Sequence, residues 1–276
     1  MNLRRRHRTV SAVLVLVLAS VLAGCMPTLV DAQAPATSSP VAEASASVGA
    51  DLTAPTSSPP PTPAPTARTE RSPRPTPRST PRRPFAMNLY QDGDFVPQHT
   101  FEWCVGASVQ MTWNLVHPDR RSSYRDQQRL WEMARDRSEN AFGGANPFGW
   151  ASVLTEIGLG RYEVVSIADY DHALRRAASA LRETNRPVGL VMWRGRHAWV
   201  MSGFESRGDP ARTDDFVVTG IRVLDPLYPH GSSIWGPSPR PNDLITPREL
   251  AADFLVRVPR NWSLDVPAGW LLVLPA

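Results

Sequence analysis

Two cysteines occur in the 276-residue sequence, and their surroundings predict different chemistry. Cys25 ends the segment Leu22-Ala23-Gly24-Cys25, whereas Cys104 follows Gln98 by six positions at the predicted start of a helix. A thiol becomes a good nucleophile where a helix N-terminus and a neighbouring imidazole lower its pKa. If Cys25 is consumed by processing, Cys104 has no partner for a disulfide bond, and such a free thiol calls for an explanation. Cys104 is therefore the candidate nucleophile.

A general base for this thiol must come from the six histidines. His197 alone begins a strong predicted strand directly after a turn, in Arg194-Gly195-Arg196-His197-Ala198-Trp199-Val200. Asp225 ends the next predicted strand, where antiparallel pairing would place it beside the start of the His197 strand and let it orient the imidazole. The remaining histidines stand in less suitable contexts, and they are His7, His99, His117, His172 and His230.

A tetrahedral intermediate also needs hydrogen-bond donors aimed at its oxyanion, each worth about 3 kcal/mol. The side-chain amide of Gln98 and the backbone N–H of Cys104 are the candidate donors.

Each of these four residues also has a purely structural interpretation. Cys104 could be a small core residue and His197 a core histidine with satisfied hydrogen bonds. Asp225 could merely form a turn before a proline, and Gln98 could be an ordinary loop residue. Their joint occurrence in this order favours the catalytic interpretation, because such sites are recognised by the roles of all members together.

The order Gln98, Cys104, His197, Asp225 resembles that of the papain-like cysteine peptidases, over about residues 90–230. The sequence is most similar to the C-39-like branch, whose other members include bacteriocin-leader peptidases. The resemblance implies that Cys104 is the nucleophile, His197 the general base and acid, Asp225 the orienting group and Gln98 an oxyanion donor. The motifs that carry it are Trp103, Ala107-Ser108-Val109-Gln110-Met111, Gly195-Arg196-His197-Ala198-Trp199-Val200 and Asp225-Pro226.

One segment departs from this family pattern. The family often has glycine and then proline or alanine after the cysteine, whereas this chain has Val105-Gly106-Ala107. Because the side chain of Val105 is bulkier, we expect this departure to affect the width of the substrate site more than the role of Cys104 as the nucleophile.

The N-terminus predicts export and a lipid anchor. A positive segment with Arg4, Arg5, Arg6 and Arg8 precedes the apolar stretch 10–22, which is short for a membrane span. The ending Leu-Ala-Gly-Cys resembles the lipobox of bacterial lipoproteins. This resemblance implies a signal peptide at residues 1–24, acylation of Cys25, and anchoring at the extracytoplasmic face of the cell membrane. The alternative is an ordinary signal peptide with a chance cysteine.

Residues 25–84, beginning with the lipidated Cys25, are predicted to form a disordered linker, because Pro, Ser, Thr and Ala dominate them. An alternative role for its six arginines is contact with anionic lipid or cell-wall polymers, although spaced charges in such tracts are usually solvated. The N-terminal segment carries +4 and the linker +2, so residues 85–276 carry −2 of the total +4. The pI near 9.6 therefore reflects the signal and linker. The sequence of residues 85–276 contains no basic stripe of the kind that indicates nucleic-acid binding.

Residues 85–276 have the length of one domain. Helical patterns come first, at 104–116, around 130, at 147–157 and at 170–181, with candidate caps at Ser122 or Ser123, Asn146 and Asp169. Strands are predicted at 188–193, 198–204, 216–224 and 269–274, with one short helix capped by Thr246 between them. The expected class is α+β. The resemblance specifies a papain-like cysteine peptidase fold, with a helical N-terminal half packed on an antiparallel-sheet half and the site at their seam.

Together these features predict a membrane-anchored extracytoplasmic thiol hydrolase that cleaves peptide or related amide bonds of a peptide or protein substrate through an acyl-enzyme. One alternative is an amidase or acyl transferase on the same fold, which acceptor-dependent product formation would reveal. A second is an inactive binding module, which an unreactive Cys104 would reveal. No cofactor or metal is expected, because no cluster has metal-ligand spacing and no phosphate-binding glycine loop occurs.

Overall fold

The computed structural model describes residues 82–139, 144–260, 263 and 265–276. The predicted signal peptide, Cys25 and nearly all of the predicted linker therefore lie outside the described residues. Strand β1 (Pro84–Asn88) begins on the last residue assigned to the linker, and Arg82 forms an ion pair with Asp215. The folded part thus includes residues slightly before position 85. Among the described residues, no helix is long and apolar enough to span a membrane.

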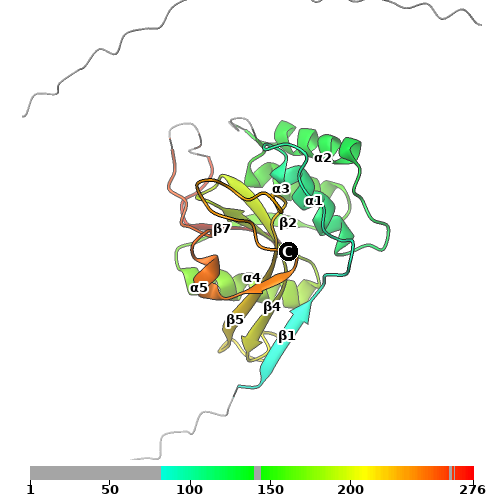
Figure 1. Ribbon diagram of the computed structural model, residues 1–276. Helices are drawn as coiled ribbons and strands as arrows, with labels where there is room; N and C mark the ends of the chain where they lie inside the picture. Colours follow the sequence, from blue (N-terminus) through cyan, green and yellow to red (C-terminus); the bar gives the residue numbers. More distant parts are fainter. Residues whose placement is uncertain (1–81, 140–143, 261–262, 264) are drawn as a thin grey trace, which may run out of the picture. The chain divides into compact units, whose positions relative to one another are not determined.

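A seven-stranded antiparallel sheet forms the centre of the fold (Figure 1). Its strands follow the order β2-β7-β3-β4-β5-β6, and β1 pairs with β4 off this path. Strand β4 is the longest and pairs with β1, β3 and β5, so it is the central support of the site described below. The strand bounds are β2 (Tyr162–Ile167), β3 (Val188–Met192), β4 (His197–Arg207), β5 (Val217–Leu224), β6 (Asp243–Ile245) and β7 (Trp270–Pro275).

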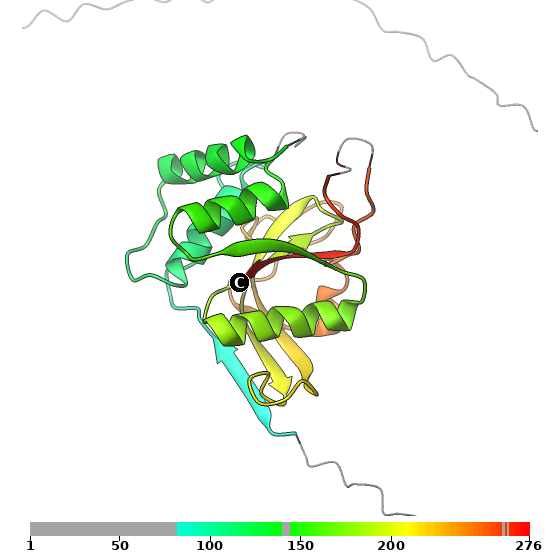
Figure 2. The ribbon, with the colours of Figure 1, turned by 180° about the vertical axis from the view of Figure 1, so that it is seen from behind.

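Helices cover both faces of this sheet. The two opposite views show one layer on one side and a single long helix on the other (Figures 1 and 2). The pleat of β4 explains how one strand serves both layers, because successive side chains point to opposite faces. Ala198 and Val200 belong to the core beneath the first layer, whereas Trp199 and Met201 belong to the core beneath the long helix. The first layer is α1 (Cys104–Asn114), α2 (Tyr124–Asp136) and α3 (Pro147–Glu156); α4 (Tyr170–Thr184) is the long helix, and α5 (Pro247–Leu250) is short.

Short-range caps start most of these helices as the sequence predicted. Ser123, Asn146 and Asp169 each accept a hydrogen bond from a backbone N–H three residues later, and Thr246 forms a capping box. Helix α1 differs, because its N-cap residue Trp103 makes no side-chain capping bond. The first N–H groups of the helix that carries Cys104 therefore have no side-chain cap.

The arrangement is more interleaved than the predicted pair of halves. The antiparallel sheet and the layer α1–α3 are confirmed, but the placement of all helices in one half is wrong, because α4 lies on the opposite face. Strands β1, β2 and β6 were also not predicted. β1 and β6 are only five and three residues long, too short for a clear alternating pattern in the sequence, although Phe85, Met87 and Ile245 pack against the core beneath α4. β2 lies at the sheet edge and pairs with β7 only.

Close packing of α1 on α2 sets the position of the first turn of α1. A Cβ on Gly106 would lie only 2.7 Å from the carbonyl oxygen of Gln127, so glycine permits this approach. The buried side chain of Gln127 then bridges several elements. Its amide donates to Gln110 Oε1 at 2.9 Å and to the Pro97 carbonyl at 3.1 Å, and its Oε1 accepts from the His99 N–H at 2.8 Å. These bonds fix the loop of Gln98 against both helices.

Candidate active site

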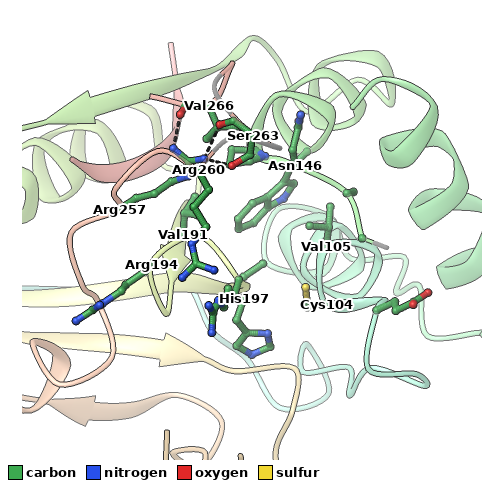
Figure 3. Close-up of a pocket in the computed structure, with 18 of the residues that line it drawn as sticks. Cys104, Val105, Asn146, Val191, Arg194, His197, Arg257, Arg260, Ser263 and Val266 are labelled. Carbon is green, nitrogen blue, oxygen red and sulfur yellow. Dashed lines mark hydrogen bonds between the residues drawn. The ribbon is translucent and has the colours of Figure 1, made fainter. Parts of the chain in front are cut away.

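Cys104 and His197 line the same pocket, which has a volume of about 470 Å³ (Figure 3). Val105 of α1 and Trp150 of α3 form part of its helical wall, and the turn 194–196 forms part of its sheet wall. The pocket therefore lies where the layer α1–α3 meets the sheet, which is the seam expected from the sequence. Val105, the residue that departs from the family pattern, faces this space, as Figure 3 shows.

The imidazole of His197 is held by the carboxylate of Asp225. The distance between His197 Nε2 and Asp225 Oδ1 is 2.6 Å, and the two residues are 6% and 0% exposed. Antiparallel pairing of β4 with β5 brings them together, since Val200 lies opposite Leu224. Asp225 Oδ1 also accepts the Leu227 N–H at 2.9 Å, the usual turn contact of an aspartate. The Asp225 carboxylate therefore makes both the turn contact and the contact with the imidazole.

Cys104 stands at the first position of α1, half-buried, and its thiol interacts electrostatically with the His197 imidazole. Burial lowers the pKa of His197, but the hydrogen bond to Asp225, the interaction with Cys104 and the charges of both groups outweigh it and raise the pKa to about 9. Because Nε2 faces Asp225, Nδ1 is the ring nitrogen left for the thiol. The structure therefore brings three of the four candidate residues together in a chain of thiol, imidazole and carboxylate.

Trp193 is a site residue that the sequence reasoning missed. Its ring stacks on the His197 imidazole, with 4.1 Å between ring centroids and 18° between planes. Trp235 stacks in turn on Trp193 at 5.9 Å and 7°. An aromatic face beside a protonated imidazole attracts its positive charge, so this contact favours the imidazolium form and fixes the ring plane. The sequence signal was a tryptophan at the turn, four positions before the histidine.

The backbone at Trp193 adopts an unfavourable conformation that its surroundings hold in place. Trp193 and Arg194 have φ values of +53° and +60°, a region that costs a non-glycine residue about 1–3 kcal/mol. Asp253 compensates with two contacts, because its carbonyl accepts the Trp193 N–H at 2.9 Å and its carboxylate accepts the indole N–H at 3.0 Å. The stacked tryptophan is therefore anchored by a residue 60 positions later in the chain.

Gln98 is placed differently from the other three candidates. Its side-chain amide donates to the Thr100 carbonyl at 2.9 Å, within its own loop, and it is not among the residues lining the pocket. Its backbone N–H donates to the Pro226 carbonyl at 2.8 Å, which ties the loop to the residue after Asp225. The proposed role of Gln98 as an oxyanion donor stays a prediction. The other candidate oxyanion donor, the backbone N–H of Cys104, lies at the start of α1 and belongs to the same residue as the reacting sulfur.

Among the described residues, no group of three His, Cys, Asp or Glu side chains is arranged to hold a metal ion.

Comparison with known proteins identifies no family. No family model matches the sequence, and no curated protein matches it. Among solved structures, one similar chain is "Crystal structure of UfSP from C.elegans", with a TM-score of 0.38 and 17% sequence identity. The match covers 67% of this chain and 31% of that chain, so this protein spans about a third of it. The assignment of a function below rests on the geometry of the site.

Replacing the carboxylate tests what sets the His197 pKa. In Asp225→Asn the contributions of the carboxylate are lost and only that of Cys104 still opposes burial, so we expect the pKa to fall from about 9 towards the ordinary 6.5, measured by NMR of labelled histidine. A pKa raised in the folded state adds stability below pH 6.5 that is lost as the pH rises through about 9. The free energy of unfolding of the wild type should therefore fall over that window, and that of the variant should not.

Asp171→Asn, which removes an exposed carboxylate on α4, is the matched control and should leave the His197 titration unchanged. An unchanged His197 titration in Asp225→Asn would show that the carboxylate does not govern this imidazole.

Proposed function

We propose that this protein is a thiol hydrolase that cleaves peptide or related amide bonds through a Cys104 acyl-enzyme, and that it belongs to the C-39-like branch of the papain-like peptidases. The observation that carries the proposal is the buried His197–Asp225 pair, whose imidazole lines the same pocket as the Cys104 thiol and interacts with it electrostatically. The order of these residues in the sequence supports it independently.

The geometry supports the following steps. His197 accepts the thiol proton, and the sulfur forms a bond to the substrate carbonyl carbon to give a tetrahedral intermediate. As the C–N bond breaks, His197 donates the proton to the leaving amine, and a thioester remains. Water then attacks the thioester while His197 takes its proton, the C–S bond breaks, and the thiol regains a proton from the imidazolium. Asp225 keeps the ring oriented and stabilises its positive charge in both halves.

The start of α1 supplies stabilisation for the intermediate. The backbone N–H of Cys104 belongs to an uncapped helix end, where partial positive charge favours a developing oxyanion. A contribution from Gln98 requires its amide to leave the Thr100 carbonyl and turn toward the substrate.

Thiol reactivity tests the proposed catalytic pair. Iodoacetamide should alkylate Cys104 at neutral pH about tenfold or more faster than free cysteine, because the imidazole assists loss of the thiol proton. The rate at the Cys104 peptide is followed by mass spectrometry, and it should fall in His197→Ala. His172→Ala removes an exposed histidine of α4 and is the matched control, with no expected change. The proposed enzyme activity would be contradicted if Cys104 reacts no faster than free cysteine, or if its alkylation rate is the same in His197→Ala.

We also propose that Cys25 is lipidated and anchors the enzyme at the extracytoplasmic face of the membrane, with the proline-rich segment as a spacer. The support is the sequence Leu22-Ala23-Gly24-Cys25 behind a basic and apolar N-terminus. Two or three acyl chains suffice for a stable anchor, because each buried methylene contributes about 0.8 kcal/mol.

Phase separation in detergent tests this anchor. The protein made in a bacterium that processes lipoproteins should enter the detergent phase, and Cys25→Ala should move it to the aqueous phase or leave it unprocessed. Cys104→Ala is the control for loss of a cysteine elsewhere and should stay in the detergent phase. Equal partitioning of the wild type and Cys25→Ala would contradict lipidation.

A further inference from the structure

The turn between β3 and β4 places two arginines at the pocket immediately before His197. Arg194 and Arg196 are both exposed and both line the pocket. Their backbone is fixed, because the N–H groups of Gly195 and Arg196 donate to the Met192 carbonyl at 2.9 and 3.0 Å. Among the described residues, neither arginine forms an ion pair with a carboxylate. Their charge is thus held beside the imidazole and is available to a ligand.

A third arginine adds a buried positive charge to the same wall. Arg257 is 5% exposed, and its side chain packs on the turn, 3.0 Å from where a Cβ on Gly195 would lie. Its guanidinium donates to the carbonyls of Ser263 and Pro267, at 2.7 and 3.0 Å, and to that of Val266. Burial lowers the pKa of Arg257 and the charge of Asp265 opposes this effect, yet guanidinium groups stay protonated in proteins. Carbonyl partners orient this cation without neutralising it.

Acidic residues also line the pocket, and their positions make its charge uneven. Asp265 acts on Arg257, Glu102 lies two residues before Cys104, and Glu139 comes from the segment after α2. Figure 3 shows Arg194, Arg257 and Arg260 on the His197 side, with Cys104 and Val105 across from them. Asp265 offsets part of the charge of Arg257, so Arg194 and Arg196 are the main source of positive charge available to a ligand on the His197 side.

We infer that the pocket selects substrates that carry a carboxylate close to the reacting carbonyl, with this anionic group against Arg194 and Arg196. The inference rests on the proposed thiol hydrolase and names its substrate class, an acidic peptide. The fork of a guanidinium matches the two oxygens of a carboxylate. Because Arg194 and Arg196 line the pocket, an anion bound there would meet their charges directly, and salt screens such short-range contacts less than it screens charges more than about 8 Å apart.

Two alkylating reagents of similar size separate this inference from the proposed function. Iodoacetate carries a carboxylate and iodoacetamide does not, and both replace iodide with the Cys104 sulfur. The readout is the ratio of the iodoacetate rate to the iodoacetamide rate at Cys104. In Arg194→Gln/Arg196→Gln we expect this ratio to fall about three- to tenfold relative to the wild type, as removal of two screened charges predicts.

Variants that keep the charge or change it elsewhere complete the experiment. Arg194→Lys/Arg196→Lys should retain most of the wild-type ratio, and Arg125→Gln, which removes an exposed arginine of α2, should leave it unchanged. A ratio that is the same in the wild type and the double glutamine variant would overturn the inference, whatever the absolute rates. Because the readout is a ratio of two rates at the same thiol, differences in the general reactivity of Cys104 among the variants cancel. A slow iodoacetamide reaction in the wild type would instead count against the proposed hydrolase.

Discussion

The hydrogen bond between His197 and Asp225 is the constraint on which the rest of the site depends. Both groups are almost fully buried, where an unpaired charge is costly. Their 2.6 Å contact and the Leu227 N–H compensate for that burial, and they require β4 and β5 to be neighbours in one register. A one-residue slip would turn the imidazole to the other face of the sheet. The sheet is therefore the part of the fold that defines the chemistry.

Elements on either side of this pair complete the site by different means. Helix α1 brings Cys104 to the imidazole, and its close contact with α2 at Gly106 limits how far that helix can shift. On the sheet side, Trp193 covers one face of the imidazole and depends on Asp253 to hold its left-handed backbone. The same turn carries the two exposed arginines into the pocket. One tight turn thus orients the base and determines the charge that a substrate meets.

Short-range features of this molecule were predictable from the sequence, and long-range ones were only partly so. The caps at Ser123, Asn146 and Asp169 act within three residues, so local sequence suffices. The approach of His197 to Asp225 followed from pairing two consecutive strong strands. The stack of Trp193 could not be predicted, because it depends on contacts with a residue 60 positions away. Gln98 illustrates the same limit, because three-dimensional packing decides whether its side-chain amide faces the Thr100 carbonyl or the pocket.

Mass spectrometry of the intact protein can detect an acyl-enzyme on Cys104. After mixing with an activated ester such as a p-nitrophenyl ester, we expect a burst of p-nitrophenolate equal to the enzyme concentration. We also expect one acyl group on the Cys104 peptide that disappears as turnover proceeds. Cys104→Ala should show neither signal. No adduct on Cys104, or an adduct that forms equally fast in His197→Ala, would show that Cys104 is not a nucleophile assisted by His197.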